Sequence, residues 1–204
     1  MTNEEIKMIL EIVNTIAIIA ASVVAIYGIN AWRKEFQGKR NIELAEEVLC
    51  LFYRAERAIE AIRFPIYYIE KQGREPEESE TPAQKQARDQ VNVIFKKIKE
   101  HSQIFDELYK LRFRFMARLE KDNAKPFDEI KSIINEIWVC TREFAELWAL
   151  ELEGKKISED TKKLREEYAS IIWSHSENDP IKPRAEKAIS DIEAICRPII
   201  LGKN

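Results

Sequence analysis

Histidine and acidic side chains are the residues of this chain that could hold a metal ion, and their spacing does not suit a metal site. Helical bundles can bind pairs of iron ions with Glu-x-x-His pairs on facing helices. The residue three positions before His101 is Ile98, and the one three positions before His175 is Ile172, so neither pair is present. The glutamates of segment 43–60 are typical of a solvated helix face. We therefore expect no metal and no cofactor.

Cysteine and serine could act as nucleophiles, but the chain carries no local signature of such a site. Cys50, Cys140 and Cys196 are far apart, and each lies in an apolar helical pattern that is typical of buried, reduced thiols. Segment 174–179, Ser-His-Ser-Glu-Asn-Asp, is the most varied polar cluster, and its place at a predicted helix end indicates capping. The sequence has no glycine-rich phosphate loop and no nucleophile elbow. We expect a protein without enzymatic activity.

Two polar residues interrupt an apolar stripe on a long predicted helix, Pro82 to about Lys121. His101 and Arg112 occupy positions that a spacing of four and three assigns to one helical face. A buried guanidinium needs a partner, so we expect Arg112 to meet a carboxylate of another helix or a water-lined groove. In a second interpretation Arg112 and His101, with Tyr67 and Tyr68 of the preceding connection, line a pocket for a small ligand or partner.

Five amphipathic helices should position these residues, and they begin after Gly38. Either Gly38 separates the first of them from the N-terminal segment, or that helix continues from the segment with a bend near Gly38. The periodicity of apolar residues predicts helices at about residues 39–64, 82–121, 126–153, 158–175 and 183–197. Short links between long helices favour antiparallel neighbours, so these helices should form a bundle. The residues that mark their starts and ends are Pro65, Thr81, Pro82, Pro126, Gly154, Ser158 and Pro198.

The core of this bundle should lie on the apolar stripes of the five helices. We expect its large buried side chains to be Phe52, Phe105, Ile134 and Trp148. Further inward positions are Trp138, Leu147, Leu164, Tyr168, Ile171, Ile172, Ala185, Ile189, Ile192 and Cys196.

An uncharged run from Ile12 to Trp32 precedes the bundle. A helix of this length is roughly 30 Å long, which matches the hydrocarbon thickness of a bilayer. A buried core helix is one alternative, although such helices seldom continue so far without a charge. A cleaved signal peptide is another, but it favours a basic start and a shorter apolar region, whereas this start carries Glu4, Glu5 and Glu11. We interpret the run as a transmembrane helix.

The flanks of this helix predict its orientation. Cations follow it at Arg33, Lys34, Lys39 and Arg40, whereas Lys7 is the only basic side chain before it. The positive-inside rule then places the N-terminus outside and the C-terminal side in the cytoplasm, with Trp32 and Tyr27 as interfacial anchors at the cytoplasmic end. Further along, three arginines could touch anionic headgroups, although neighbouring glutamates dilute their effect. These are Arg54, Arg57 and Arg63.

The fold class that follows is all-α: an N-terminal transmembrane helix and then a cytoplasmic bundle of about five long helices. The anchor comprises residues 1–38, with the span at about 12–32, and the bundle comprises residues 39–204. The bundle is long enough for one domain with a real core. A formal net charge of -3 argues against a general nucleic-acid binder, which needs a basic face.

The first predicted soluble helix resembles a known group of proteins. Its segments Lys39-Arg40, 42–47 (Ile-Glu-Leu-Ala-Glu-Glu), Phe52-Tyr53, Ala58-Ile59 and 62–65 (Ile-Arg-Phe-Pro) are similar to those of bacterial single-pass proteins with one N-terminal membrane helix. The similarity covers about the first third of the chain. It implies a location in the bacterial inner membrane and supplies no catalytic residues.

We expect a membrane-tethered interaction or scaffold protein, because the anchor raises the local concentration of the bundle at the bilayer. The partner would be a second copy, a cytoplasmic protein or a membrane protein, as in a regulator of a membrane complex or a stress or defence component. The alternative is a sensor that binds a small ligand between its helices.

Overall fold

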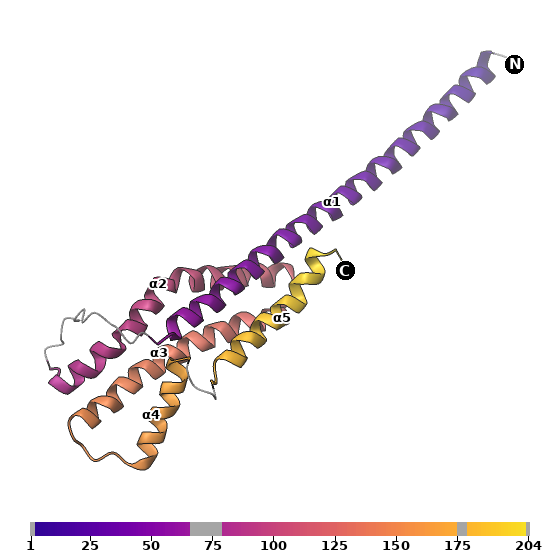
Figure 1. Cartoon of the computed structure of the whole chain (residues 1–204). Coiled ribbons are helices and arrows are strands. Elements are labelled where there is room, and N and C mark those ends of the chain that lie inside the picture. The colour runs from indigo at the N-terminus through magenta and orange to yellow at the C-terminus, as the bar shows by residue number, and fades with distance from the viewer. Residues whose placement is uncertain (1–2, 66–78, 175–178, 203–204) are drawn as a thin grey trace. The chain divides into compact units, whose positions relative to one another are not determined.

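The computed structural model describes residues 3–65, 79–174 and 179–202, and every element in these ranges is helical. The predicted all-α class is therefore confirmed. The elements are α1 (Asn3–Arg63), α2 (Pro82–Arg118), the 3-10 helix η1 (Lys121–Ala124), α3 (Lys125–Leu152), α4 (Glu159–Ile172) and α5 (Lys182–Ile200), as Figure 1 shows.

The predicted anchor and the first predicted soluble helix are one continuous helix, α1. The backbone stays helical through Gly38, so the expected separation at this residue is absent and the alternative of a nearly continuous helix is confirmed. A glycine inside a helix costs about 1 kcal/mol relative to alanine, which long flanking helical segments can tolerate. The chain divides into two compact units, Met1–Leu44 and Ala45–Asn204, so the boundary between them falls within α1.

Most of the predicted helix ends are confirmed. Thr81 forms a capping box with Gln84, whose backbone N–H donates to the Thr81 hydroxyl over 3.2 Å. Ser158 caps α4, and Gly154 ends the α3 region with a φ of 70°, a conformation that favours glycine. Pro198 is an exception, because it lies inside α5 and the helix continues to Ile200. Proline removes its own N–H donor, but its φ is compatible with a last helical turn.

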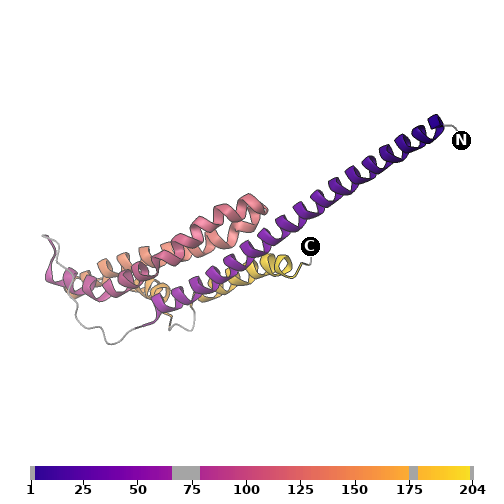
Figure 2. The same cartoon turned by 90° about the horizontal axis from the view of Figure 1, so that it is seen from above.

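The second unit is an antiparallel bundle, as predicted from the short links. Contacts between α1 and α2 pair Glu47 with Arg114 over 3.0 Å and Arg54 with Glu107 over 3.5 Å, so the two helices run in opposite directions. Figures 1 and 2 show α2, α3, α5 and residues 45–63 of α1 side by side, with α4 packed against α3.

An aromatic cluster joins three of these helices in the core. Phe52 of α1 meets the ring of Phe127 of α3 edge-on, with centroids 4.8 Å apart. Phe115 of α2 lies 5.2 Å from the same ring. All three side chains are buried, which confirms the prediction for Phe52.

The predictions for the other large core side chains are wrong. Phe105, Ile134 and Trp148 are only half-buried, and the buried positions of α3 include Ile133 and Ala149 instead. Because α3 packs against α2, α4 and α5, its buried surface is broader than the single stripe that an alternating spacing of three and four describes.

On α4 the predicted inward face is too wide. Only Ile172 is buried, whereas Leu164 is exposed and Tyr168 and Ile171 are half-buried. Since α4 packs mainly against α3, one narrow stripe is sufficient.

Trp138 of α3 is exposed, contrary to expectation. The predicted inward residues of α5 are all buried: Ala185, Ile189, Ile192 and Cys196.

The three cysteines are all free, but they differ in exposure. Cys140 and Cys196 are buried as predicted, whereas Cys50 is exposed, which contradicts the expectation for it. Its neighbours Leu49 and Leu51 occupy the buried side of α1, so Cys50 points away from the core. Burial raises the pKa of the Cys140 thiol to about 11 and that of Cys196 to about 12.

We expect one fast-reacting thiol in the native protein. A maleimide at neutral pH should modify Cys50 within minutes, because a thiolate must form and be accessible before it reacts. Cys140 and Cys196 should react only after unfolding in denaturant. Intact mass measured before and after denaturation tests this. A second native adduct would contradict the packing of α3 or α5, and a Cys50→Ser variant that shows no native adduct provides the control.

Candidate functional site

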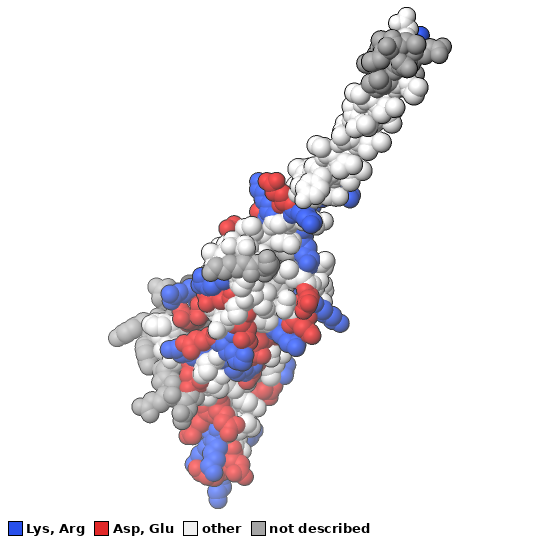
Figure 3. Space-filling model, turned by 90° about the vertical axis from the view of Figure 1, so that its right-hand side faces the viewer, with Lys and Arg blue, Asp and Glu red and all other residues white. Residues whose placement is uncertain are grey.

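The apolar part of α1 is the most distinctive surface of the chain. The segment Ile12–Arg63 contains an 18-residue window that is apolar enough to cross a membrane, and none of that window is buried. A buried core helix would have its apolar side chains covered, so the core-helix alternative does not fit. A signal sequence near an N-terminus can pass the same test of length and composition. In Figure 3 the apolar part of α1 is white up to the charged residues that follow it.

Aromatic and basic side chains gather where this apolar stretch ends. The Trp32 and Phe36 rings stack with centroids 5.7 Å apart, and the side chains are 63% and 48% exposed. The Arg40 guanidinium lies over the Phe36 ring, 5.5 Å from its centroid. The remaining basic residues of this region, all exposed, are Arg33, Lys34 and Lys39. Such a combination suits the interface between hydrocarbon and headgroups. We call residues 32–40 the interfacial segment.

Arg112 meets a carboxylate of another helix, which confirms that prediction. Its guanidinium donates to Asp128 of α3 over 2.8 Å, and the two side chains are 18% and 54% exposed. The hydrogen bond to Asp128 raises the pKa of Arg112 and outweighs burial, which lowers it. The Arg112 Nε atom is buried and has no hydrogen-bond partner among the described residues. The geometry is that of a salt bridge between α2 and α3.

Replacing Arg112 with Met should therefore have a small effect. Asp128 is half-exposed and regains water when it loses its partner, and the buried Nε no longer needs one. We expect a change of about 1 kcal/mol or less in the free energy of unfolding, measured by urea denaturation. A loss above about 3 kcal/mol would show that Asp128 becomes an uncompensated buried charge.

The structure does not gather the predicted pocket residues into one site. His101 is half-buried and lies three helical turns from Arg112 on α2, roughly 16 Å along the axis. Neither lines the cavity described below. Tyr67 and Tyr68 lie outside the described residues.

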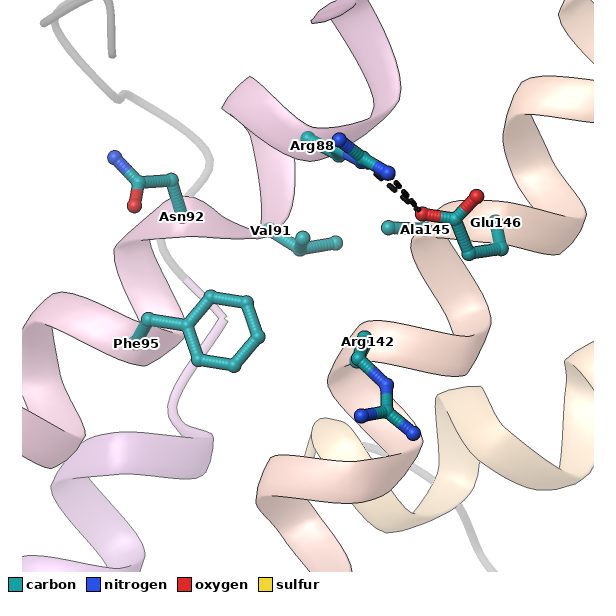
Figure 4. A pocket seen from close by; sticks show the side chains of 7 residues that line it. All are labelled: Arg88, Val91, Asn92, Phe95, Arg142, Ala145 and Glu146. Atoms are coloured by element: carbon teal, nitrogen blue, oxygen red, sulfur yellow. Dashed lines mark hydrogen bonds and ion pairs between the residues drawn. The ribbon is translucent and has the colours of Figure 1, made fainter. Parts of the chain in front are cut away.

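A shallow cavity of about 260 Å³ lies between α2 and α3 instead. Figure 4 shows Arg88 and Glu146 joined at one side, with Phe95 and Arg142 facing each other across it. Arg88 donates to Glu146 over 2.7 and 3.0 Å, and Arg142 donates to Glu143 over 2.7 and 3.0 Å. Both guanidinium charges are therefore balanced by protein carboxylates, and the floor is apolar. Its remaining lining residues are Val91, Asn92 and Ala145.

Sequence reasoning missed one polar cluster, which surrounds the C-terminal end of α1. Arg63 is only 2% exposed, so its guanidinium is not accessible to lipid headgroups and the expectation of headgroup contact is wrong for it. Its guanidinium forms a two-pronged ion pair with Asp179 over 2.8 and 2.9 Å. It also donates to carbonyls at the C-terminal end of α4, those of Ser170, Ile171 and the C-cap residue Trp173, over 2.8–3.3 Å. These contacts satisfy carbonyls that a helix end leaves without partners.

Asp179 completes this cluster at the start of α5. Its carboxylate accepts the amides of Ile181 and Lys182 over 2.9 and 3.1 Å, which supports the capping interpretation for the end of segment 174–179. Burial alone would raise the pKa of Asp179, but the hydrogen bonds from Arg63 and from these amides outweigh it and lower the pKa. The cluster thus ties together α1, α4 and α5.

Comparison with protein-family models, with curated proteins and with solved structures finds no match for this chain.

Proposed function

We propose that this chain is a membrane-tethered helical interaction protein, in which residues 12–32 of α1 span the bilayer and the bundle meets a protein partner or a second copy. The observation that carries the proposal is the wholly exposed apolar window of α1, which would be costly to leave in water. The interfacial segment that follows, with Trp32 and Phe36 exposed, suits the headgroup region.

The bundle offers surface for a partner on α2. Tyr109 and Phe113 are exposed, and their rings meet edge-on with centroids 5.2 Å apart. The Lys131 ammonium lies 4.3 Å from the Tyr109 ring. Aromatic side chains are enriched at protein interfaces. Among the described residues no group of three or more metal-binding side chains occurs.

The proposed orientation has the N-terminus outside and the bundle in the cytoplasm of a bacterium, at the inner membrane. The supporting observation is the excess of cations after residue 32. A reporter enzyme fused after Asn204 should then be active only if it is a cytoplasmic type. Activity of a periplasmic reporter at that position would show that the orientation is the opposite of the one proposed.

Membrane extraction tests the tether itself. The full chain should remain in the membrane pellet after alkaline carbonate washing, because a spanning helix is held by its apolar surface. Its intact mass should include the residues before 33. A mature protein that lacks them would identify the segment as a cleaved signal sequence and refute the tether.

Binding of a small ligand is the second candidate function, and the cavity between α2 and α3 favours it. Phe95 and Arg142 could contact a small molecule that has an apolar part and a hydrogen-bond acceptor. A thermal-shift screen of the wild type and of Arg142→Gln would test this. A ligand that stabilises the wild type more than the variant would support the site. Equal shifts would place binding elsewhere.

A further inference from the structure

Most of the described arginines fall into two groups. In the bundle, arginines pair with carboxylates, as in Arg54 with Glu107 and Arg114 with Glu47. The other paired arginines are Arg57, Arg63, Arg88, Arg112, Arg142, Arg165, Arg184 and Arg197. In the interfacial segment, Arg33 and Arg40 form no ion pair with any described residue. The same holds for Lys34 and Lys39, so four neighbouring cations keep their charge available.

Three of these cations share one side of α1 with the aromatic pair. At about 100° per residue, residues 32, 33, 36, 39 and 40 fall within an arc of ~120°. Lys34 and Glu35 project outside that arc. The next carboxylate on the same side is Glu43, roughly 5 Å further along the axis than Arg40. The ring of Phe36 holds the Arg40 guanidinium at 5.5 Å, which orients it without neutralising it.

We infer that this side of α1, formed by Trp32, Arg33, Phe36, Lys39 and Arg40, selects anionic phospholipids. The inference rests on the proposed tether, because it requires the apolar window to lie in a bilayer. Trp32 and Phe36 would lie at the level of the glycerol backbone, and the three cations would reach phosphates and anionic headgroups. A zwitterionic lipid offers the same phosphate but no net charge, so it is bound less well.

The expected preference follows from the cation count. Each basic side chain near an anionic surface strengthens the association of protein and lipid by about fivefold. Salt screens this attraction, with a Debye length of about 10 Å at 0.1 M. Because the cations share a small number of lipids, we expect an overall preference for anionic lipid of roughly tenfold rather than the product of one fivefold factor per cation.

The test uses the full chain in bilayers with spin-labelled phosphatidylglycerol or phosphatidylcholine as the probe. The fraction of immobilised probe gives the relative association of each lipid. The wild type should prefer phosphatidylglycerol by roughly tenfold at low salt. The variant with Arg33→Gln, Lys39→Gln and Arg40→Gln should approach equal association. Phe36→Leu keeps the apolar bulk but removes the aromatic face, so it should lose part of the preference.

A matched variant removes the same charge from the bundle through Lys99→Gln, Lys110→Gln and Lys163→Gln. These exposed lysines form no ion pair with described residues, so the lipid preference should be unchanged. Equal association of both lipids with the wild type would overturn the inference, as would an equal loss in the matched variant. Displacement by dissolved glycerol phosphate would also overturn it, since the site would then bind a phosphate without a membrane. If the chain does not stay in the bilayer at all, the proposed tether fails instead.

Discussion

Replacing Arg63 with Met should lower the free energy of unfolding by about 3–5 kcal/mol, the usual cost of leaving a buried charge without its partner. Asp179 would lose both hydrogen bonds from the guanidinium, and the last carbonyls of α4 would lose their donor. Urea denaturation of the full chain in detergent micelles, followed by circular dichroism, measures this loss.

Arg57 provides the matched control for this substitution. It lies on the same helix and pairs with Glu60, but its side chain is 81% exposed. Arg57→Met should therefore change the free energy of unfolding by less than about 0.5 kcal/mol. If Arg63→Met costs no more than Arg57→Met, the cluster around Asp179 does not hold α1, α4 and α5 together.

Acid should reveal the same cluster without a mutation. The pKa of Asp179 is lowered in the folded protein, so its contribution to stability is present above the unfolded pKa of about 3.9 and is lost as pH falls through the folded value. The difference in stability between the wild type and Asp179→Asn should be constant from neutral pH to about pH 5 and shrink below that. A difference that persists unchanged at pH 2 would contradict the ion pair.

The second large effect concerns the apolar window of α1. Ala20→Arg should make the free energy of membrane insertion less favourable by about 2.5–3.5 kcal/mol, because it places a charge near the centre of the proposed span. Among the described helices no other could span a membrane, so no second span would shelter the guanidinium. The fraction of full-length chain that resists carbonate extraction should fall sharply.

Ala20→Leu is the control for side-chain size. It should leave the fraction of chain that resists carbonate extraction unchanged, because leucine favours the bilayer. The bundle should fold in both variants, since residues 12–32 contribute no buried side chain to it. If Ala20→Arg resists extraction as well as the wild type, the chain is held at the membrane by something other than this segment.

Local chemistry was readable from the sequence because it depends on neighbours in the chain. The apolar run, the N-cap at Thr81, the cap at Ser158 and the glycine end at Gly154 each follow from residue types within one or two turns. The period of the apolar residues also predicted the all-α class and the buried face of α5.

The partner of Arg112 shows where this reasoning reaches its limit. A cation in an apolar stripe predicts a carboxylate from another helix, and the structure supplies Asp128. The sequence did not say which carboxylate, because that depends on the register between α2 and α3. The same register creates the cavity beside Arg88 and Arg142, two residues that the stripe analysis passed over.

Burial within the bundle was decided by the number of neighbours each helix has. A helix between several others buries a broad surface, so Ile133 and Ala149 of α3 are covered where the stripe favoured Ile134 and Trp148. On α4 one neighbour suffices, and Leu164 remains exposed. Arg63 is the clearest case, since it appeared to be a surface cation. Its partner lies 116 residues away in the chain, and only folding brings α1, α4 and α5 together so that the guanidinium can be buried with each of its three nitrogens hydrogen-bonded.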